Sequence, residues 1–200
     1  MTATAAIHFR GNRLAQVLLR AAGWRVRFDG LPALQGVLIV YPHTSNWDFP
    51  VGLLAKWAIG LPVKFWGKDS LFRYPVFGRW MRAVGGIPVD RSAPQGVVQE
   101  MAERLRAARA NGQLFWLALS PEGTRSYRDH WRSGFYHLVL AADVPLGLVT
   151  LDWGRREVGV QTFVTLSGDP VRDMALIAGH LQGVRARRPE RAAPVTLAAP

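Results

Sequence analysis

The chain alternates short apolar runs with segments in which apolar residues recur at helical spacing. Such alternation is typical of an α/β domain, in which strands are connected by helices that pack on a mostly parallel sheet. Of its 200 residues 49% are hydrophobic, which is enough apolar surface for one folded core. We therefore expect a single α/β domain whose mostly parallel sheet is flanked by helices.

The expected elements are short and follow one another closely along the sequence. The expected strands are Val37–Tyr41, Val63–Trp66, Ile87–Val89, Phe115–Leu119, Leu146–Leu151 and Val158–Val164. The expected helices are Arg10–Ala22, Asp48–Ile59, Gly78–Val84, Gly96–Ala110, Phe135–Ala142 and Arg172–Val184. Ligands of such sheets gather at the carboxyl ends of the strands, so the loops after the strands are the candidates for a site.

By composition the chain divides into three parts. Residues 1–30 form a basic amphipathic segment, and residues 31–184 form the α/β domain. Residues 185–200 are rich in Arg, Ala and Pro, and we expect a disordered basic tail there.

Basic residues concentrate at the two ends of the chain. Lys and Arg number 25 against 14 Asp and Glu, and the formal net charge is +11. Residues 1–30 carry five arginines against one aspartate, and residues 183–200 carry four arginines against one glutamate. Such ends suit an anionic partner, either a phospholipid surface or a nucleic acid. Because the sequence shows no zinc-ligand spacing, aromatic RNA-binding motif or recognition helix, a nucleic-acid-binding module is the remote alternative.

The first expected helix is amphipathic, and a second stretch, Leu71–Trp80, interleaves aromatic residues with arginines. The apolar stripe of the helix can lie in a membrane interface or pack on the domain, and the sequence leaves both open. No apolar run reaches the roughly 18 residues needed to span a bilayer, and no signal peptide is evident. We therefore expect neither a spanning segment nor export. The stripe consists of Leu14, Val17, Leu18 and Ala21.

The first polar group at a strand end is the pair His43 and Asp48, in the stretch PHTSNWD after Val37–Tyr41. We expect His43 in the strand-to-helix loop and Asp48 in the first helical turn, where the helix dipole stabilises a carboxylate. An aspartate that holds one ring nitrogen of a histidine leaves the other nitrogen to act as a general base. The simpler interpretation is a polar loop that caps the helix.

Two further loops carry groups that bind anions. In GGIPVDR, Arg91 follows a short strand, where its guanidinium can bind a phosphate or a carboxylate. The stretch SPEGTRS follows Phe115–Leu119 and offers a flexible glycine, two hydroxyls, an arginine and a glutamate that can orient an arginine or bind a hydroxyl. Each loop taken alone can be a surface turn. The candidates in the second loop are Glu122, Gly123, Thr124, Arg125 and Ser126.

Together these loops supply a base, an acid that orients it and several anion-binding groups. The sequence has no cysteine, no Gly-x-Ser-x-Gly nucleophile motif and no cluster of metal ligands, so we expect neither a metal nor a covalent nucleophile. The predicted chemistry is attack by a substrate hydroxyl, deprotonated by His43, on an activated electrophile.

Three stretches, in this order, resemble the signature blocks of the glycerolipid acyltransferases, and most closely those of bacterial lysophosphatidate (1-acylglycerol-3-phosphate) acyltransferases. They are the HxxxxD pair His43 and Asp48, the run from Gly86 to Arg91, and the run from Glu122 to Ser126. The proline-bearing run around Pro145 is similar to the fourth block. The resemblance implies a glycerol-3-phosphate acyltransferase-like fold.

The resemblance also implies roles for these residues. His43 is the general base oriented by Asp48, and an acceptor hydroxyl attacks the thioester of acyl-CoA or of acyl carrier protein, with no bound cofactor and no acyl-enzyme. Lys68, Arg91 and the loop of Glu122, Gly123, Thr124 and Arg125 hold the acceptor phosphate, with Ser126 beside them.

The expected acceptor is a lysophospholipid such as 1-acylglycerol-3-phosphate, and another lipid, such as a lyso-ornithine lipid, is the alternative. The expected partners are this lysolipid, the acyl-CoA or acyl carrier protein donor, and an anionic membrane surface rather than nucleic acid. The expected location is cytoplasmic, peripheral on the inner face of the membrane.

Overall fold

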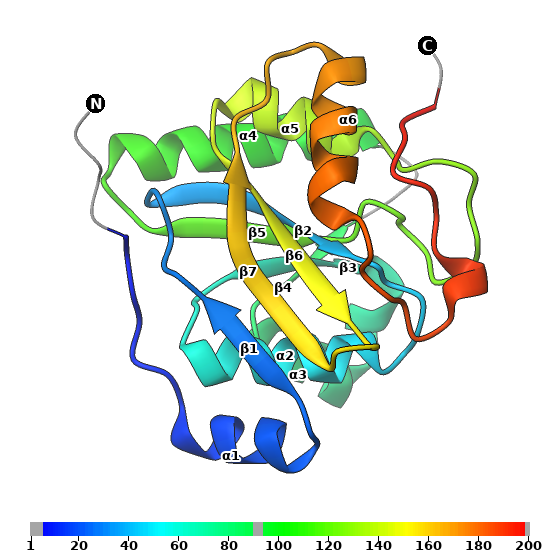
Figure 1. Cartoon of the computed structure of the whole chain (residues 1–200). Coiled ribbons are helices and arrows are strands. Elements are labelled where there is room, and N and C mark those ends of the chain that lie inside the picture. Colours follow the sequence, from blue (N-terminus) through cyan, green and yellow to red (C-terminus); the bar gives the residue numbers. More distant parts are fainter. Residues whose placement is uncertain (1–5, 90–93, 199–200) are drawn as a thin grey trace.

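The structure is a computed structural model that describes residues 6–89 and 94–198. A sheet runs through the middle of the molecule, and helices cover both of its faces (Figure 1). In the described part of the chain the sheet has seven strands in the order β1-β7-β6-β2-β5-β3-β4. Strands β6 and β7 pair antiparallel, and the other neighbouring strands pair parallel. The prediction of a single α/β domain with a mostly parallel sheet is confirmed.

The expected strands and helices are all present, with ends displaced by at most three residues. The strands are β1 Arg25–Phe28, β2 Gln35–Tyr41, β3 Lys64–Lys68, β4 Gly86–Val89, β5 Phe115–Leu119, β6 Leu146–Asp152 and β7 Glu157–Val164. The helices are α1 Arg13–Ala21, α2 Asp48–Ile59, α3 Pro75–Ala83, α4 Pro94–Ala110, α5 Gly134–Ala142 and α6 Pro170–Leu181. Two short 3₁₀ helices are η1 Asp69–Phe72 and η2 Pro189–Arg191.

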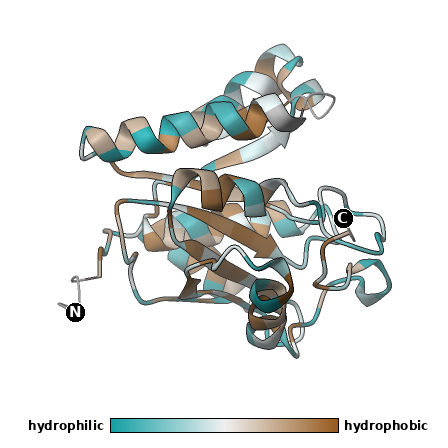
Figure 2. Ribbon diagram, turned by 90° about the horizontal axis from the view of Figure 1, so that it is seen from above, coloured by the Kyte–Doolittle hydropathy of each residue, from teal (hydrophilic) through white to brown (hydrophobic). Residues whose placement is uncertain are grey.

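Strand β2 lies in the interior of the sheet because its side chains are apolar on both faces. Val37 and Ile39 pack into a core formed with α4, α5 and α6, whereas Leu38 packs into the core on the α1 and α2 side. Figure 2 shows hydrophobic residues concentrated along the central strands, while the helices carry both hydrophobic and hydrophilic residues. The two cores hold β2 in place, and with it the loop that follows its carboxyl end.

The sheet opens between β3 and β5 near its carboxyl edge. The last pair between these strands is Phe65 with Ala118, whereas β3 remains paired with β4 as far as Lys68 with Val89. Beyond Phe65, residues of both strands line a cavity of about 1710 Å³. This cavity therefore lies at the edge of the sheet where ligands of α/β domains bind.

The amino-terminal part differs from the expectation of a separate segment over residues 1–30. Strand β1 was not expected, yet it pairs in parallel with β7, so the sheet begins before residue 30. Its four residues alternate arginine with an apolar side chain. This alternation contains no apolar run long enough to predict a strand. The pairing of β1 with β7 forms only in the folded domain.

Helix α1 turns most of its expected apolar stripe away from the domain. Ala15 and Leu19 are the residues that it buries against the core, whereas Leu14, Val17 and Leu18 are 66%, 60% and 47% exposed. Of the two possibilities left open by the sequence, packing of this stripe on the domain is therefore wrong. Among the described residues no helix combines the length and the apolar character that a membrane span needs.

The prediction of a disordered tail over residues 185–200 is wrong for residues 185–198, which we call the C-terminal strap. The N–H of Ala193 donates to Glu122 Oε1 at 3.1 Å, and the Tyr41 hydroxyl donates to the Ala193 carbonyl at 3.0 Å. The N–H of Trp131 donates to the Thr196 carbonyl at 2.7 Å. The composition of the strap predicts little side-chain burial, but its backbone groups find partners on the domain.

The end of α2 supplies a test of the fold. Gly60 has a φ of +71°, in the left-handed region that favours glycine, and a Cβ there would lie 2.3 Å from the Arg10 carbonyl oxygen. We expect Gly60→Ala to lower the free energy of unfolding by about 1–3 kcal/mol in urea denaturation. In Gly52→Ala, the control within the same helix, the new Cβ meets nothing within 4 Å, and we expect slight stabilisation. Equal effects of the two substitutions would contradict the left-handed conformation of Gly60 and its close approach to the Arg10 carbonyl.

Candidate active site

His43 and Asp48 meet at the carboxyl end of β2. The strand ends at Tyr41, and the loop that follows brings His43 against the first turn of α2, which begins at Asp48. His43 Nδ1 lies 3.5 Å from Asp48 Oδ2. The Asp48 carboxylate is almost fully buried, whereas the imidazole is 21% exposed. The structure thus brings this predicted pair together, with the carboxylate buried and the imidazole at the surface of the cavity.

The Asp48 carboxylate is held by donors on both of its oxygens. The N–H of Ser45 donates to Oδ2 at 2.6 Å, and the indole Nε1 of Trp153 donates to Oδ1 at 2.8 Å. Burial raises the pKa of Asp48, while these hydrogen bonds and the charge of Arg125 act in the opposite direction. A carboxylate fixed in this way can hold the imidazole of His43 in one orientation.

Glu122, expected to contact the substrate, is instead buried and is not among the residues that line the cavity. Its side chain is 1% exposed and lies beneath the His43 loop. Oε2 accepts a hydrogen bond from the N–H of His43 at 2.5 Å, and Oε1 accepts one from the N–H of Ala193 at 3.1 Å. Burial raises the pKa of Glu122 to about 7, although both hydrogen bonds oppose this change. The carboxylate therefore ties the His43 loop to the C-terminal strap.

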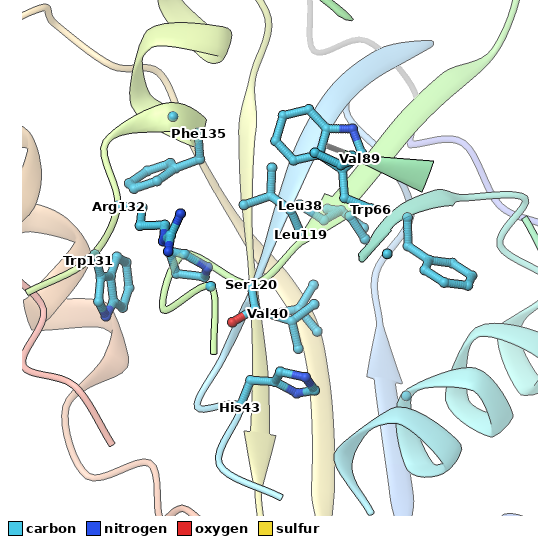
Figure 3. Close-up of a pocket in the computed structure, with 18 of the residues that line it drawn as sticks. Leu38, Val40, His43, Trp66, Val89, Leu119, Ser120, Trp131, Arg132 and Phe135 are labelled. Carbon is cyan, nitrogen blue, oxygen red and sulfur yellow. The ribbon is translucent and has the colours of Figure 1, made fainter. Parts of the chain in front are cut away.

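A mostly apolar cavity adjoins the imidazole. Figure 3 shows His43 at one end of it, with Val40 and Ser120 next to the ring, and Trp66 and Trp131 on facing sides. These residues come from four separate stretches of the chain, which meet because parallel strands end at the same edge of the sheet. The site therefore combines the His43 imidazole with an apolar space beside it.

The other predicted site residues are distributed around this cavity. Lys68, Gly123, Thr124 and Arg125 line it. Ser126 is exposed and does not belong to the described lining, and its N–H donates to Thr124 Oγ1 at 3.2 Å. Arg91 lies outside the described residues.

Sequence reasoning missed Trp153 and the C-terminal strap. Trp153 follows β6 and contacts Asp48 across 105 residues of sequence, outside all the motifs. The strap also reaches the His43 loop directly, because the N–H of Arg188 donates to Thr44 Oγ1 at 3.2 Å. Both contacts depend on the folded topology, and the only signal in the sequence is an aromatic residue two positions after the predicted strand Leu146–Leu151.

Comparison with known proteins places this site in a family. A family model described as Acyltransferase matches residues 25–150, which is more than half of the chain. The chain belongs to the acyltransferase family. The family that the three motifs indicate is thereby confirmed, and both His43 and Asp48 lie within the matched region.

Two curated relatives resemble this chain over about half of its length. The 1-acyl-sn-glycerol-3-phosphate acyltransferase of Limnanthes douglasii is 29% identical over 109 residues, and that of Limnanthes alba is 28% identical over 108 residues. Each match covers 52% of this chain and 38% of the relative. The chain therefore spans about two fifths of the length of these curated relatives.

A solved structure shares the fold of this chain. The crystal structure of the 1-acyl-sn-glycerophosphate (LPA) acyltransferase PlsC from Thermotoga maritima matches with a TM-score of 0.55 at 17% sequence identity. The match covers 87% of this chain and 78% of the other. At this identity the comparison shows the fold alone.

The raised pKa of Glu122 makes the stability of the folded domain depend on pH. Because its pKa is about 7 in the folded protein against an ordinary value of 4.5, the folded state binds this proton more tightly. The contribution of Glu122 to the free energy of unfolding therefore falls as pH rises between these two values. Relative to Glu122→Gln, we expect the wild type to lose on the order of 3 kcal/mol from pH 4.5 to pH 7.5 in urea denaturation.

The matched control is Glu103→Gln, the same change at an exposed carboxyl on α4. Its stability should follow that of the wild type across this range of pH. If Glu122→Gln also follows the wild type, Glu122 does not carry the raised pKa.

Proposed function

We propose that this chain is an O-acyltransferase that moves a fatty acyl chain from an acyl thioester to a hydroxyl of a lysophospholipid such as 1-acylglycerol-3-phosphate. The thioester is carried by coenzyme A or by acyl carrier protein. The observation that carries the proposal is the contact of His43 Nδ1 with the buried Asp48 carboxylate beside an apolar cavity. The family match and the names of the two curated relatives support it.

In the proposed mechanism His43 is a general base. Asp48 holds Nδ1 in its protonated form, so Nε2 takes the proton of the acceptor hydroxyl as its oxygen attacks the thioester carbonyl carbon. The tetrahedral intermediate then breaks its C–S bond, and the imidazolium returns the proton to the departing thiolate. The products are an ester and a free thiol, and the acyl group is never attached to the protein. The buried carboxylate stabilises the imidazolium while it exists.

The cavity offers separate surfaces to the apolar and the charged parts of the substrates. Leu38, Trp66 and Leu119 are among the apolar residues of its lining and suit a fatty acyl chain. Lys68 and Arg125 also line it and can bind a phosphate through charge-assisted hydrogen bonds. This arrangement supports an acceptor that carries a phosphate next to the reacting hydroxyl.

We further propose that the face formed by α1 and α3 rests on an anionic membrane surface, namely the inner face of the membrane. Beside the exposed stripe of α1, α3 exposes Val76, Phe77 and Trp80 by 77%, 43% and 40%. Both helices adjoin α2 on the same side of the sheet (Figure 1). Exposed arginines accompany the apolar residues on this face and suit anionic lipid. They are Arg10, Arg13, Arg20, Arg73 and Arg79.

Removing the base should remove the transfer. We expect His43→Ala to lower acceptor-dependent thiol release from the thioester by about 10²- to 10⁴-fold. The assay uses acyl-CoA and acyl carrier protein donors with a panel of lysophospholipids and a lyso-ornithine lipid. His180→Ala, at an exposed position on α6, should keep the wild-type rate. Full activity of His43→Ala, or a wild type that is inactive with both donors and every acceptor, would contradict the proposal.

The membrane surface is tested by flotation with phospholipid vesicles. We expect the wild-type protein to float with vesicles that contain anionic lipid, and Val17→Asp to lower its partition roughly tenfold because an apolar contact becomes a negative charge. Leu176→Asp is the control, because Leu176 is 46% exposed on α6, a helix on the opposite face of the sheet. Flotation that does not depend on anionic lipid, or equal losses of partition in the two variants, would overturn the assignment of the α1 and α3 face as the membrane-binding surface.

A further inference from the structure

Trp153 donates a side-chain hydrogen bond to Asp48 Oδ1. The indole Nε1 donates to this oxygen at 2.8 Å. The other oxygen, Oδ2, receives the N–H of Ser45 at 2.6 Å and lies 3.5 Å from His43 Nδ1. A carboxylate can rotate about the bond to its Cβ, and a donor on Oδ1 selects the rotation that leaves Oδ2 facing the imidazole.

The indole ring is itself held by both ends of the chain. Trp24, just before β1, meets it edge to face with ring centroids 4.8 Å apart. On the strap, the Arg187 guanidinium lies 4.5 Å from the ring centroid, and the Arg185 carbonyl accepts the backbone N–H of Trp153 at 2.8 Å. Contacts of these kinds restrict the ring to one orientation and thus fix the direction of its N–H.

We propose that Trp153 is a positioning residue for the His43–Asp48 pair, acting through its indole N–H on the Asp48 carboxylate. The inference rests on the proposed function for its effect on catalysis. Trp153 and the strap lie beyond residue 150, where the family match ends, so this support belongs to a part of the chain outside the matched region. Through these contacts Arg187 of the strap is connected to Trp153, Trp153 to Asp48, and Asp48 to His43.

The test compares Trp153→Phe, which keeps an aromatic ring but removes the N–H, with Trp116→Phe. Trp116 is 1% exposed and donates its own indole N–H to the Ala33 carbonyl at 3.0 Å, so the control loses a hydrogen bond of the same kind elsewhere. We expect Trp153→Phe to lower kcat on the order of tenfold with the KM of both substrates unchanged, and Trp116→Phe to keep the wild-type kcat. Urea denaturation checks that both variants are folded.

A second readout does not depend on activity. The ¹⁵N spectrum of labelled histidine distinguishes the two neutral tautomers of His43, and His43→Ala assigns the signal. The wild type and Trp116→Phe should show the Nδ1-protonated form, and Trp153→Phe should show a mixture of the two forms. Trp153→Leu, which also removes the ring, separates packing from hydrogen bonding.

The outcomes are distinct. Wild-type tautomer and kcat in Trp153→Phe, with loss only in Trp153→Leu, would reduce Trp153 to a packing residue and overturn the inference while the proposed function stands. A wild-type protein whose His43 is protonated on Nε2 also overturns it, whether or not the variants fold. If no acceptor is used by the wild type, the proposed function fails and the tautomers alone decide the role of Trp153.

Discussion

Two buried carboxylates hold the loop that carries His43. Asp48 receives the N–H of Ser45 and the indole of Trp153, and Glu122 receives the N–H groups of His43 and Ala193. Burying two carboxylates so close together costs solvation free energy, which these hydrogen bonds offset only in part, and the pKa of each is raised. Because the donors come from distant parts of the chain, the site is complete only when the whole domain is folded.

The sheet determines where this loop meets a substrate. Strands β2 and β5 are parallel neighbours, so the loops after them, one with His43 and the other with Glu122, leave the sheet at the same edge. Pairing between β5 and β3 ends at Phe65 and Ala118, and the apolar cavity lies beside the loops at this opening. Strand pairing thus brings His43, the apolar cavity and the cations Lys68 and Arg125 to the same edge of the sheet.

Local patterns predicted the α-helices and all the described strands except β1. They also predicted the His43–Asp48 pair, because a loop of a few residues between β2 and α2 determines the geometry of that pair. Such local patterns could not predict contacts between residues that lie far apart in the sequence. Glu122 reads as a polar loop residue because nothing nearby shows that Ala193 returns to bury it. The composition of the strap predicts disorder. Strand β1 has four residues, two of them arginine, and its sequence does not predict a strand without the pairing with β7. The resemblance to the acyltransferases, by contrast, rested on ordered motifs and was confirmed by the family match.

We propose that His43 activates the acceptor for direct transfer, with no acyl group passing through the protein. The most direct measurement is the intact mass of the protein during incubation with acyl-CoA alone, followed by addition of the lysolipid acceptor, with thiol release recorded in parallel. The mass should stay at the unmodified 22.2 kDa throughout, and thiol should appear only after the acceptor is added. An acyl adduct that forms on the protein before the acceptor is present and disappears after its addition would contradict the claim.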